Sequence, residues 1–178
     1  PFPCRAGILS HAEGVDLMPA NIELSGTEVA LVNAMSREHA MRSWLDRAKR
    51  GYDFAIIDCP PSLGMMTINA LTAADGVVVP VQAQYLPAKG MTQLVKTVGR
   101  VRRHINPSLR IEGVLLTLVD ARTNLARQVE RSIRGSYGEA LRVYEATVPV
   151  AVKAAESSAH GKSVFAYDAS GKVARAYA

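Results

Sequence analysis

The sequence has few cysteines, few aromatic residues and no long apolar run. Its two cysteines, Cys4 and Cys59, are too few for a disulfide framework and lack the spacing of metal ligands. Aromatic residues make up only 6% of the chain, and they form no platform on which nucleic-acid bases would stack. No apolar segment is long enough to span a bilayer. We therefore expect a reduced, cytoplasmic protein.

Two glycine-rich motifs are also missing from the 178 residues. No Gly-x-Gly-x-x-Gly follows an apolar run, which argues against a dinucleotide-binding oxidoreductase. The phosphate-binding loop Gly-x-x-x-x-Gly-Lys-Ser/Thr is absent as well. Gly161-Lys162-Ser163 has the right ending, but Glu156 stands where the first glycine belongs. Because a carboxylate repels phosphate and the segment follows a predicted helix, we expect no phosphate-binding loop here.

Short apolar runs alternate with helical patterns along the chain. The runs predict strands at 15–18, 54–57, 76–81, 113–119 and 143–148. The helical patterns predict helices from about residue 25, from an N-cap at Ser36 to Gly51, after residue 62 or 64, over 86–105 and over 124–137. This alternation is typical of an α/β fold with a mostly parallel β-sheet flanked by helices. The chain length fits a single domain over 1–178.

Asp58 directly follows the apolar run Phe54–Ile57. In an open α/β sheet, ligands bind at the carboxyl ends of the strands. A carboxylate there can hold a hydrated Mg²⁺ that faces the phosphates of a nucleotide. Pro60 and Pro61 then take the chain out of the sheet as a stiff extended turn. The alternative is an aspartate that merely ends a strand, and the run and Asp58 alone leave both interpretations open.

A longer segment narrows the choice. Tyr52-Asp-Phe-Ala-Ile-Ile-Asp-Cys-Pro-Pro-Ser62 resembles the Walker B segment of the ParA/Soj/MinD family of deviant P-loop ATPases. The resemblance continues in order through 17–28, 67–75, 79–82, 111–117, 120–125, 159–163 and 167–168, so it covers nearly the whole chain. The segment 82–90 is similar to family members carried on mobile elements.

The resemblance implies a P-loop NTPase-like fold of the SIMIBI class. It implies an enzyme that binds ATP and Mg²⁺, forms a homodimer on ATP binding and binds DNA without sequence specificity. Such a protein partitions a chromosome, plasmid or mobile element at the nucleoid together with a ParB-like centromere-binding protein, without a membrane partner.

In family members the first strand and the phosphate-binding loop precede the stretch matched by Val15–Met18. We therefore expect a fold that is incomplete at its N-terminus, with the last helix truncated. On its own such a fragment should have no nucleotide bound, should not bind ATP tightly and should not hydrolyse it. The strand at 54–58 should be left with an unpaired apolar edge that favours aggregation.

The resemblance also assigns nucleotide-site residues by position. Asp58 takes the Walker B role at the magnesium ion, through water, and Pro60 belongs to the same segment. Thr117 and Pro149 fall in the segments that flank the adenine. Family members normally read Pro-Arg-Asn-Val-Arg in the second of these segments, whereas this chain has Pro149-Val-Ala-Val-Lys153.

Arg122 and Lys153 match basic positions linked to DNA binding in the family. Arg127, Arg131 and Arg134 recur at helical spacing and extend that surface in our prediction. Lysine and arginine contacts to phosphate give salt-sensitive affinity without base readout.

The formal net charge of +5 is consistent with a polyanion partner. Six basic residues and no acidic residue lie between Asp75 and Glu112, although a solvated helix face explains that run equally well. Two other functions stay open: a nucleotide-independent module that binds DNA or a partner on the same scaffold, and a MinD-like positioning ATPase.

Overall fold

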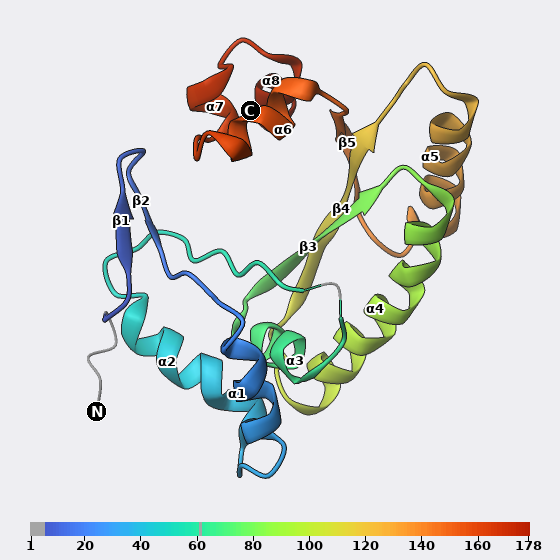
Figure 1. Ribbon diagram of the computed structural model, residues 1–178. Coiled ribbons are helices and arrows are strands. Elements are labelled where there is room, and N and C mark those ends of the chain that lie inside the picture. The colour runs from blue at the N-terminus through green and yellow to red at the C-terminus, as the bar shows by residue number, and fades with distance from the viewer. Residues whose placement is uncertain (1–5, 61) are drawn as a thin grey trace. The chain divides into compact units, whose positions relative to one another are not determined.

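The computed structural model describes residues 6–60 and 62–178 (Figure 1). Cys4 and Pro61 lie outside the described residues. The chain divides into two compact units, of which the first comprises 1–76 with 97–110 and the second comprises 77–96 with 111–178. Each unit buries its own set of side chains and is described by itself.

The first unit contains a β-hairpin. Strand β1 (Leu9–His11) pairs with β2 (Val15–Leu17) in the antiparallel direction. The three-residue connection ends at Gly14, whose φ of 77° lies in the left-handed region that glycine adopts without strain. The strand expected at 15–18 is therefore confirmed as β2, but it belongs to a two-stranded hairpin.

Three α-helices and a short 3₁₀-helix follow in the first unit: α1 (Leu24–Leu31), η1 (Arg37–His39), α2 (Ala40–Ala48) and α3 (Met65–Ala73). The prediction of these helices is confirmed, and Ser36 stands at the N-cap position of η1 as expected, but without a side-chain cap. The φ of Ser36 is 52°, in the left-handed region, whereas N-cap residues usually take extended backbone angles. Its side chain makes no capping hydrogen bond.

Buried polar side chains hold α3 in place within the first unit. The side chain of Asn69 is 2% exposed, and its Oδ1 accepts a hydrogen bond from the backbone N–H of Met41 at 3.1 Å. Its Nδ2 donates to the carbonyl of Arg37 at 2.9 Å. At the start of α3, Oε1 of Glu28 accepts from the backbone N–H of Met65 at 2.7 Å. An amide at the start of a helix has no partner within the helix, so Glu28 satisfies it.

The prediction of a buried strand at Phe54–Ile57 is wrong. Residues 54–60 have no regular secondary structure, and the side chains of Phe54 and Ile56 are 86% and 95% exposed. A β-strand exists only through ladder hydrogen bonds with a neighbour, and no described strand pairs with this segment. Its composition is that of a buried strand, but composition does not supply the pairing partner.

The second unit is built on a parallel three-stranded sheet. Its strands β3 (Gly76–Gln82), β4 (Arg110–Val119) and β5 (Val143–Pro149) lie in the order β3–β4–β5. All three arrows point the same way in Figure 1, and β4 pairs with β5 in parallel with Leu116 opposite Thr147 and Val119 opposite Pro149. The three predicted strands are confirmed, with β4 beginning earlier than expected.

Helices α4 (Tyr85–His104) and α5 (Asn124–Tyr137) confirm the two predicted helices. Both lie on the same side of the sheet in Figure 1, where the part of α4 up to Lys96 belongs to the second unit. Alternate residues of the strands point into the core between the sheet and these two helices. The buried residues of that core are Val79, Val81, Ala83, Met91, Val114, Leu116, Val119, Ala126, Val129 and Ile133. Period-two strands and a helix with apolar residues on one face produce this arrangement.

Three short helices follow β5: α6 (Val152–Ala159), α7 (Val164–Tyr167) and α8 (Lys172–Tyr177). They gather beyond the carboxyl ends of the strands (Figure 1). Helix α8 packs against β5 and buries Val173 and Ala174. The α/β fold class predicted from the sequence is thereby confirmed. Residues of α6, α8 and the connecting loops lie at the carboxyl ends of β4 and β5.

Candidate functional site

A pocket of about 600 Å³ opens at the carboxyl ends of β4 and β5 in the second unit. Valine and alanine side chains line it together with charged groups. Its lining residues are Val119, Asp120, Ala121, Arg122, Pro149, Val150, Ala151, Val152, Lys153, Ala154, Val164, Asp168, Gly171, Lys172, Val173 and Ala174. Ligands of parallel α/β sheets bind at this end of the strands, so the pocket is the candidate site of this unit.

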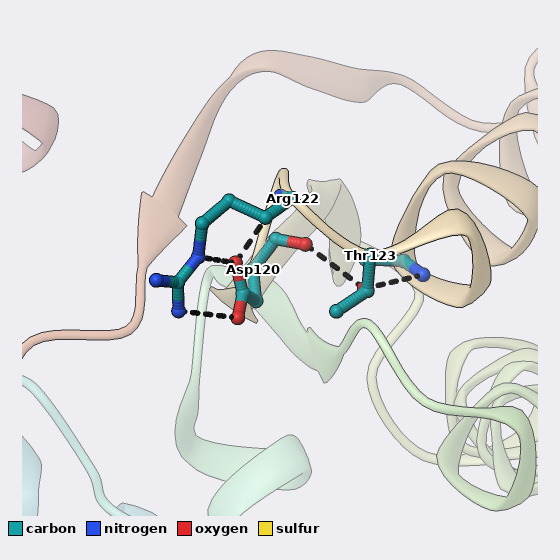
Figure 2. A network of polar contacts seen from close by, with 4 residues as sticks. Asp120, Arg122 and Thr123 are labelled. Carbon is teal, nitrogen blue, oxygen red and sulfur yellow. Dashed lines mark hydrogen bonds and ion pairs between the residues drawn. The ribbon is translucent and has the colours of Figure 1, made fainter.

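Arg122 and Asp120 form a two-pronged ion pair beside the pocket (Figure 2). Nε of Arg122 donates to Oδ1 of Asp120 and Nη2 donates to Oδ2, both at 2.9 Å. The backbone N–H of Arg122 also donates to Oδ1, at 3.1 Å. These hydrogen bonds from the Arg122 side chain and backbone lower the pKa of Asp120 to about 2.

Thr123 joins this turn to α5. Its hydroxyl donates to the carbonyl of Asp120 at 2.9 Å and accepts from the backbone N–H of Ala126 at 3.2 Å. The second bond caps the N-terminus of α5, and the first fixes the turn that follows β4. Figure 2 shows Thr123 on the side of the turn that faces the helix. The backbone that carries Asp120 and Arg122 is thus held from both sides.

Lys153 lines the same pocket from the start of α6. Its Nζ lies 3.3 Å from Oδ1 of Asp168, so it also has an acidic partner. Asp168 lies close to Gly171, where a Cβ atom would collide with its carboxylate. The structure therefore brings together Arg122 and Lys153, which the sequence predicted as DNA contacts, on one pocket.

Pro149 also lines the pocket, and Thr117 does not. Thr117 is half-buried within β4, and its carbonyl accepts from the backbone N–H of Ala83 at 3.1 Å. The backbone N–H of Val150 donates to the carbonyl of Val119 at 3.3 Å, which extends the β4–β5 pairing to the pocket floor. Of the two residues predicted beside adenine, only Pro149 reaches the pocket.

The arginines of α5 divide into two groups. Arg127 and Arg131 are exposed and lie together at a shallow depression on the helix surface, and their role in DNA binding stays a prediction. Arg134 instead links α5 to β5, because its Nη2 donates to the carbonyl of Tyr144 at 3.0 Å. The same Nη2 lies 3.1 Å from Oε1 of Glu130, one turn earlier in α5. Helical spacing placed Arg134 with the other two, but its side chain is already engaged within the unit.

Asp58 and Pro60 belong to the first unit, where both are exposed in the irregular segment 54–60. Neighbouring Cys59 is a free thiol whose pKa is raised by burial and by the charge of Asp58. In the part of the chain that the structure describes, no group of three or more acidic, histidine or cysteine side chains is arranged to hold a metal ion. Asp58 supplies a single exposed carboxylate, and the expectation that it holds Mg²⁺ through water stays a prediction.

The segment Gly161-Lys162-Ser163 does not have the form of a phosphate-binding loop. It follows α6 rather than a strand, and Gly161 has a φ of 59°. The hydroxyl of Ser163 accepts from the backbone N–H of Ala166 at 3.1 Å, which caps α7. A phosphate-binding loop connects a strand to a helix, so the expectation from the sequence is confirmed.

The sequence prediction assigned a role to Arg122 and Lys153, two of the three basic residues on the pocket, but not to Lys172 or to the acidic partners Asp120 and Asp168. For Asp120 a signal was present, since an aspartate two residues before an arginine and three before a capping threonine is typical of a turn that bonds its own backbone. For Asp168 no local signal exists, because it lies far from Lys153 in the sequence.

A family model described as "AAA domain" matches residues 4–111. The sporulation initiation inhibitor protein Soj of Bacillus subtilis is 46% identical over 165 residues, which cover 93% of this chain and 64% of that protein. The chromosome partitioning protein ParA of Caulobacter vibrioides is 41% identical over 165 residues, covering 92% of this chain and 61% of that protein. The chain thus spans less than two-thirds of the length of these relatives.

Among solved structures, a cobyrinic acid a,c-diamide synthase from Mycobacterium smegmatis with bound ADP and magnesium is 39% identical. It has a TM-score of 0.76 and matches 82% of this chain and 59% of that one. None of the helices within 6–60 and 62–178 is both long and apolar enough to cross a bilayer. On the family model, the relatives and the parallel sheet together, the chain belongs to the AAA domain family and is of the ParA/Soj type of P-loop ATPases.

Proposed function

We propose that this chain is part of a DNA-partition ATPase that segregates a chromosome, plasmid or mobile element at the nucleoid. The observation that carries the proposal is the convergence of Arg122 and Lys153 on one pocket from two different segments. Two cations brought together at the carboxyl ends of β4 and β5 suit phosphate groups better than base edges. The name of the C. vibrioides relative points the same way, since it is a chromosome partitioning protein.

The basic surface extends from this pocket along α5. Arg127 and Arg131 are exposed on the helix that Thr123 caps, so they follow Arg122 in space as well as in sequence. Contacts of this kind neutralise phosphates and release counterions, which gives affinity that falls with salt. A ParB-like partner and a homodimer that forms on ATP binding complete the proposed assembly.

The described residues supply only part of a nucleotide site. In the proposal, the apolar pocket wall at Pro149 in β5 receives the base, with Thr117 in the neighbouring strand β4. In the first unit, Asp58 is proposed to hold Mg²⁺ through water. The phosphates require backbone amides and a lysine from a phosphate-binding loop, which the 178 residues do not contain. Because the 178 residues lack these phosphate-binding groups, we derive no catalytic step through the cation or the nucleotide.

Titration of unrelated duplex DNA sequences with the 178-residue chain tests the proposal. Equal affinity for all sequences and a steep loss of affinity with rising salt are expected. Fluorescence anisotropy of short labelled duplexes measures both. Absence of binding at low salt would overturn the proposal.

This titration distinguishes one other function, and titrations of the intact protein with and without ATP and with vesicles distinguish two more. The diamide synthase name of the M. smegmatis structure favours an ATP-dependent amide-forming enzyme, which has no reason to bind DNA. A nucleotide-independent module would bind DNA equally in the intact protein whether or not ATP is added. A MinD-like positioning ATPase would bind vesicles instead, although α8 already buries Val173 and Ala174 within its own unit.

A further inference from the structure

We propose that Asp120 is a positioning residue, which holds the guanidinium of Arg122 in the orientation that a DNA phosphate requires. The inference rests on the proposed DNA-binding function and adds to it a residue that is itself negatively charged. An acidic side chain beside a DNA contact would ordinarily be expected to weaken binding by repulsion.

The ion pair occupies one edge of the guanidinium and leaves another available. Nε and Nη2 of Arg122 both donate to the carboxylate of Asp120. Within the described part of the chain Nη1 makes no hydrogen bond, and the side chain as a whole is 89% exposed. Arginine binds phosphate through two parallel N–H groups, and the Nη1–Nη2 edge retains such a pair.

The arrangement restricts Arg122 along its whole length. The backbone N–H of Arg122 donates to the same carboxylate as the guanidinium, so both ends of the side chain are tied to Asp120. Thr123 holds the next residue against the carbonyl of Asp120 and against α5. A free arginine loses rotamer freedom when it binds a phosphate, whereas one that is already held loses less.

The presence of this ion pair is not explained by its contribution to the stability of the fold. Exposed ion pairs contribute little to the free energy of folding, and the cap of α5 comes from Thr123 rather than from Asp120. Orientation of the guanidinium is the effect that a two-pronged contact provides and a single contact does not.

Lys153 and Asp168 provide the matched comparison. They line the same pocket and carry the same charges, but Nζ of Lys153 meets Asp168 through one contact of 3.3 Å. An ammonium group is a point charge whose three N–H groups rotate, so Asp168 does not orient it. Asp120→Ala and Asp168→Ala each remove one negative charge from the pocket, and repulsion alone predicts tighter DNA binding for both.

The test compares these variants of the 178-residue chain in anisotropy titrations with a short labelled duplex at low salt. We expect Asp168→Ala to bind as tightly as the unchanged chain or more tightly. Asp120→Ala should bind on the order of two- to tenfold more weakly, because Arg122 must then be ordered during binding. Asp120→Asn keeps an acceptor for the backbone N–H of Arg122 but loses the charged clamp, so it should also bind more weakly while melting normally.

The Arg122→Lys variant distinguishes orientation of the Arg122 guanidinium from a general structural role of Asp120. In the Arg122→Lys variant, Asp120 has no guanidinium to orient, so adding Asp120→Ala should not weaken DNA binding further. A merely structural role for Asp120 would weaken binding in both backgrounds, and that result would overturn the inference. Equal or tighter binding by Asp120→Ala and Asp120→Asn, with Arg122→Ala weaker than the unchanged chain, would overturn it while leaving the DNA-binding proposal intact. Unchanged binding by Arg122→Ala would overturn both.

Discussion

The side-chain amide of Asn106 donates a hydrogen bond to the backbone carbonyl of Ala74, at 2.8 Å. The same Nδ2 lies within hydrogen-bonding distance of the carbonyls of Leu71 and Thr72, so one buried side chain serves the C-terminal end of α3. Carbonyls at a helix end have no partner within the helix, and Asn106 is 1% exposed. This contact ties the last turn of α4 and the residues that follow it to α3 within the first unit.

Replacement of Asn106 by alanine should therefore destabilise the chain. Buried carbonyls left without a donor cost about 1–3 kcal/mol, and Asn106→Asp should cost more because it places a carboxylate against them. Urea unfolding followed by circular dichroism measures the change. Asn33→Ala, at an exposed position, should stay within about 0.5 kcal/mol. A loss as small as that for Asn106→Ala would show that the amide is not needed.

The exposed apolar side chains of residues 54–60 predict self-association. Phe54 and Ile56 are among the most exposed large apolar residues of the described chain, at 86% and 95%. Substitution of both by lysine should reduce association, because two positive charges replace the exposed apolar side chains and repel a second copy. Sedimentation velocity compares this variant with Met35→Lys, which removes an isolated side chain of equal exposure, 96%. A monodisperse monomer of the unchanged chain would contradict the prediction.

Asp120 should titrate far below an ordinary aspartate. Its pKa is about 2 in the folded chain against a usual value of 3.8, because Arg122 donates to its ionised form. The small contribution of this exposed pair to stability is therefore present above about pH 4 and lost as the pH falls through about 2. Carbon-detected NMR of the Asp120 carboxyl follows this titration.

In Arg122→Ala the pKa of Asp120 should rise toward its usual value. Arg131→Ala removes the same charge from α5 without removing a hydrogen bond to Asp120, so it should leave that pKa near 2. A normal pKa in the unchanged chain would show that the ion pair does not form in solution.

The chain by itself should bind ATP weakly. Its 178 residues contain no phosphate-binding loop, and Asp58 offers one exposed carboxylate to a polyanionic nucleotide. Calorimetric titration with ATP and excess Mg²⁺ should show no submicromolar affinity, and phosphate release should not exceed the background. Submicromolar binding would mean that other residues hold the phosphates.

Sequence reasoning predicted most of the fold because apolar periodicity reports which side of an element is buried. The strands β3, β4 and β5 and the helices α4 and α5 were found in this way. The same reasoning failed at Phe54–Ile57, since a strand also needs a partner that its own residues do not specify. At Ser36 the sequence located the start of a helix, but its left-handed backbone carries no side-chain capping hydrogen bond.

The candidate site was only partly predictable for a related reason. Arg122, Lys153 and Pro149 were recognised by position and do meet at one pocket. Asp120 is only two residues from its partner Arg122, whereas the pairing of Lys153 with Asp168 and the contact of Arg134 with β5 join different elements of the chain. Side-chain pairing across such distances is a property of the folded unit, and no local pattern of residue types encodes it.

The salt dependence of DNA binding by Arg122→Ala/Lys153→Ala tests the central claim most directly. Each lost phosphate contact should reduce the slope of log affinity against log salt by about 0.9, so the double variant should bind more weakly and with a shallower slope. Arg102→Ala/Arg103→Ala removes two exposed positive charges from the end of α4, in the first unit, and should keep the original slope. If the two double variants behave alike, or if Arg122→Ala/Lys153→Ala keeps its low-salt affinity, the pocket at β4 and β5 is not the DNA site.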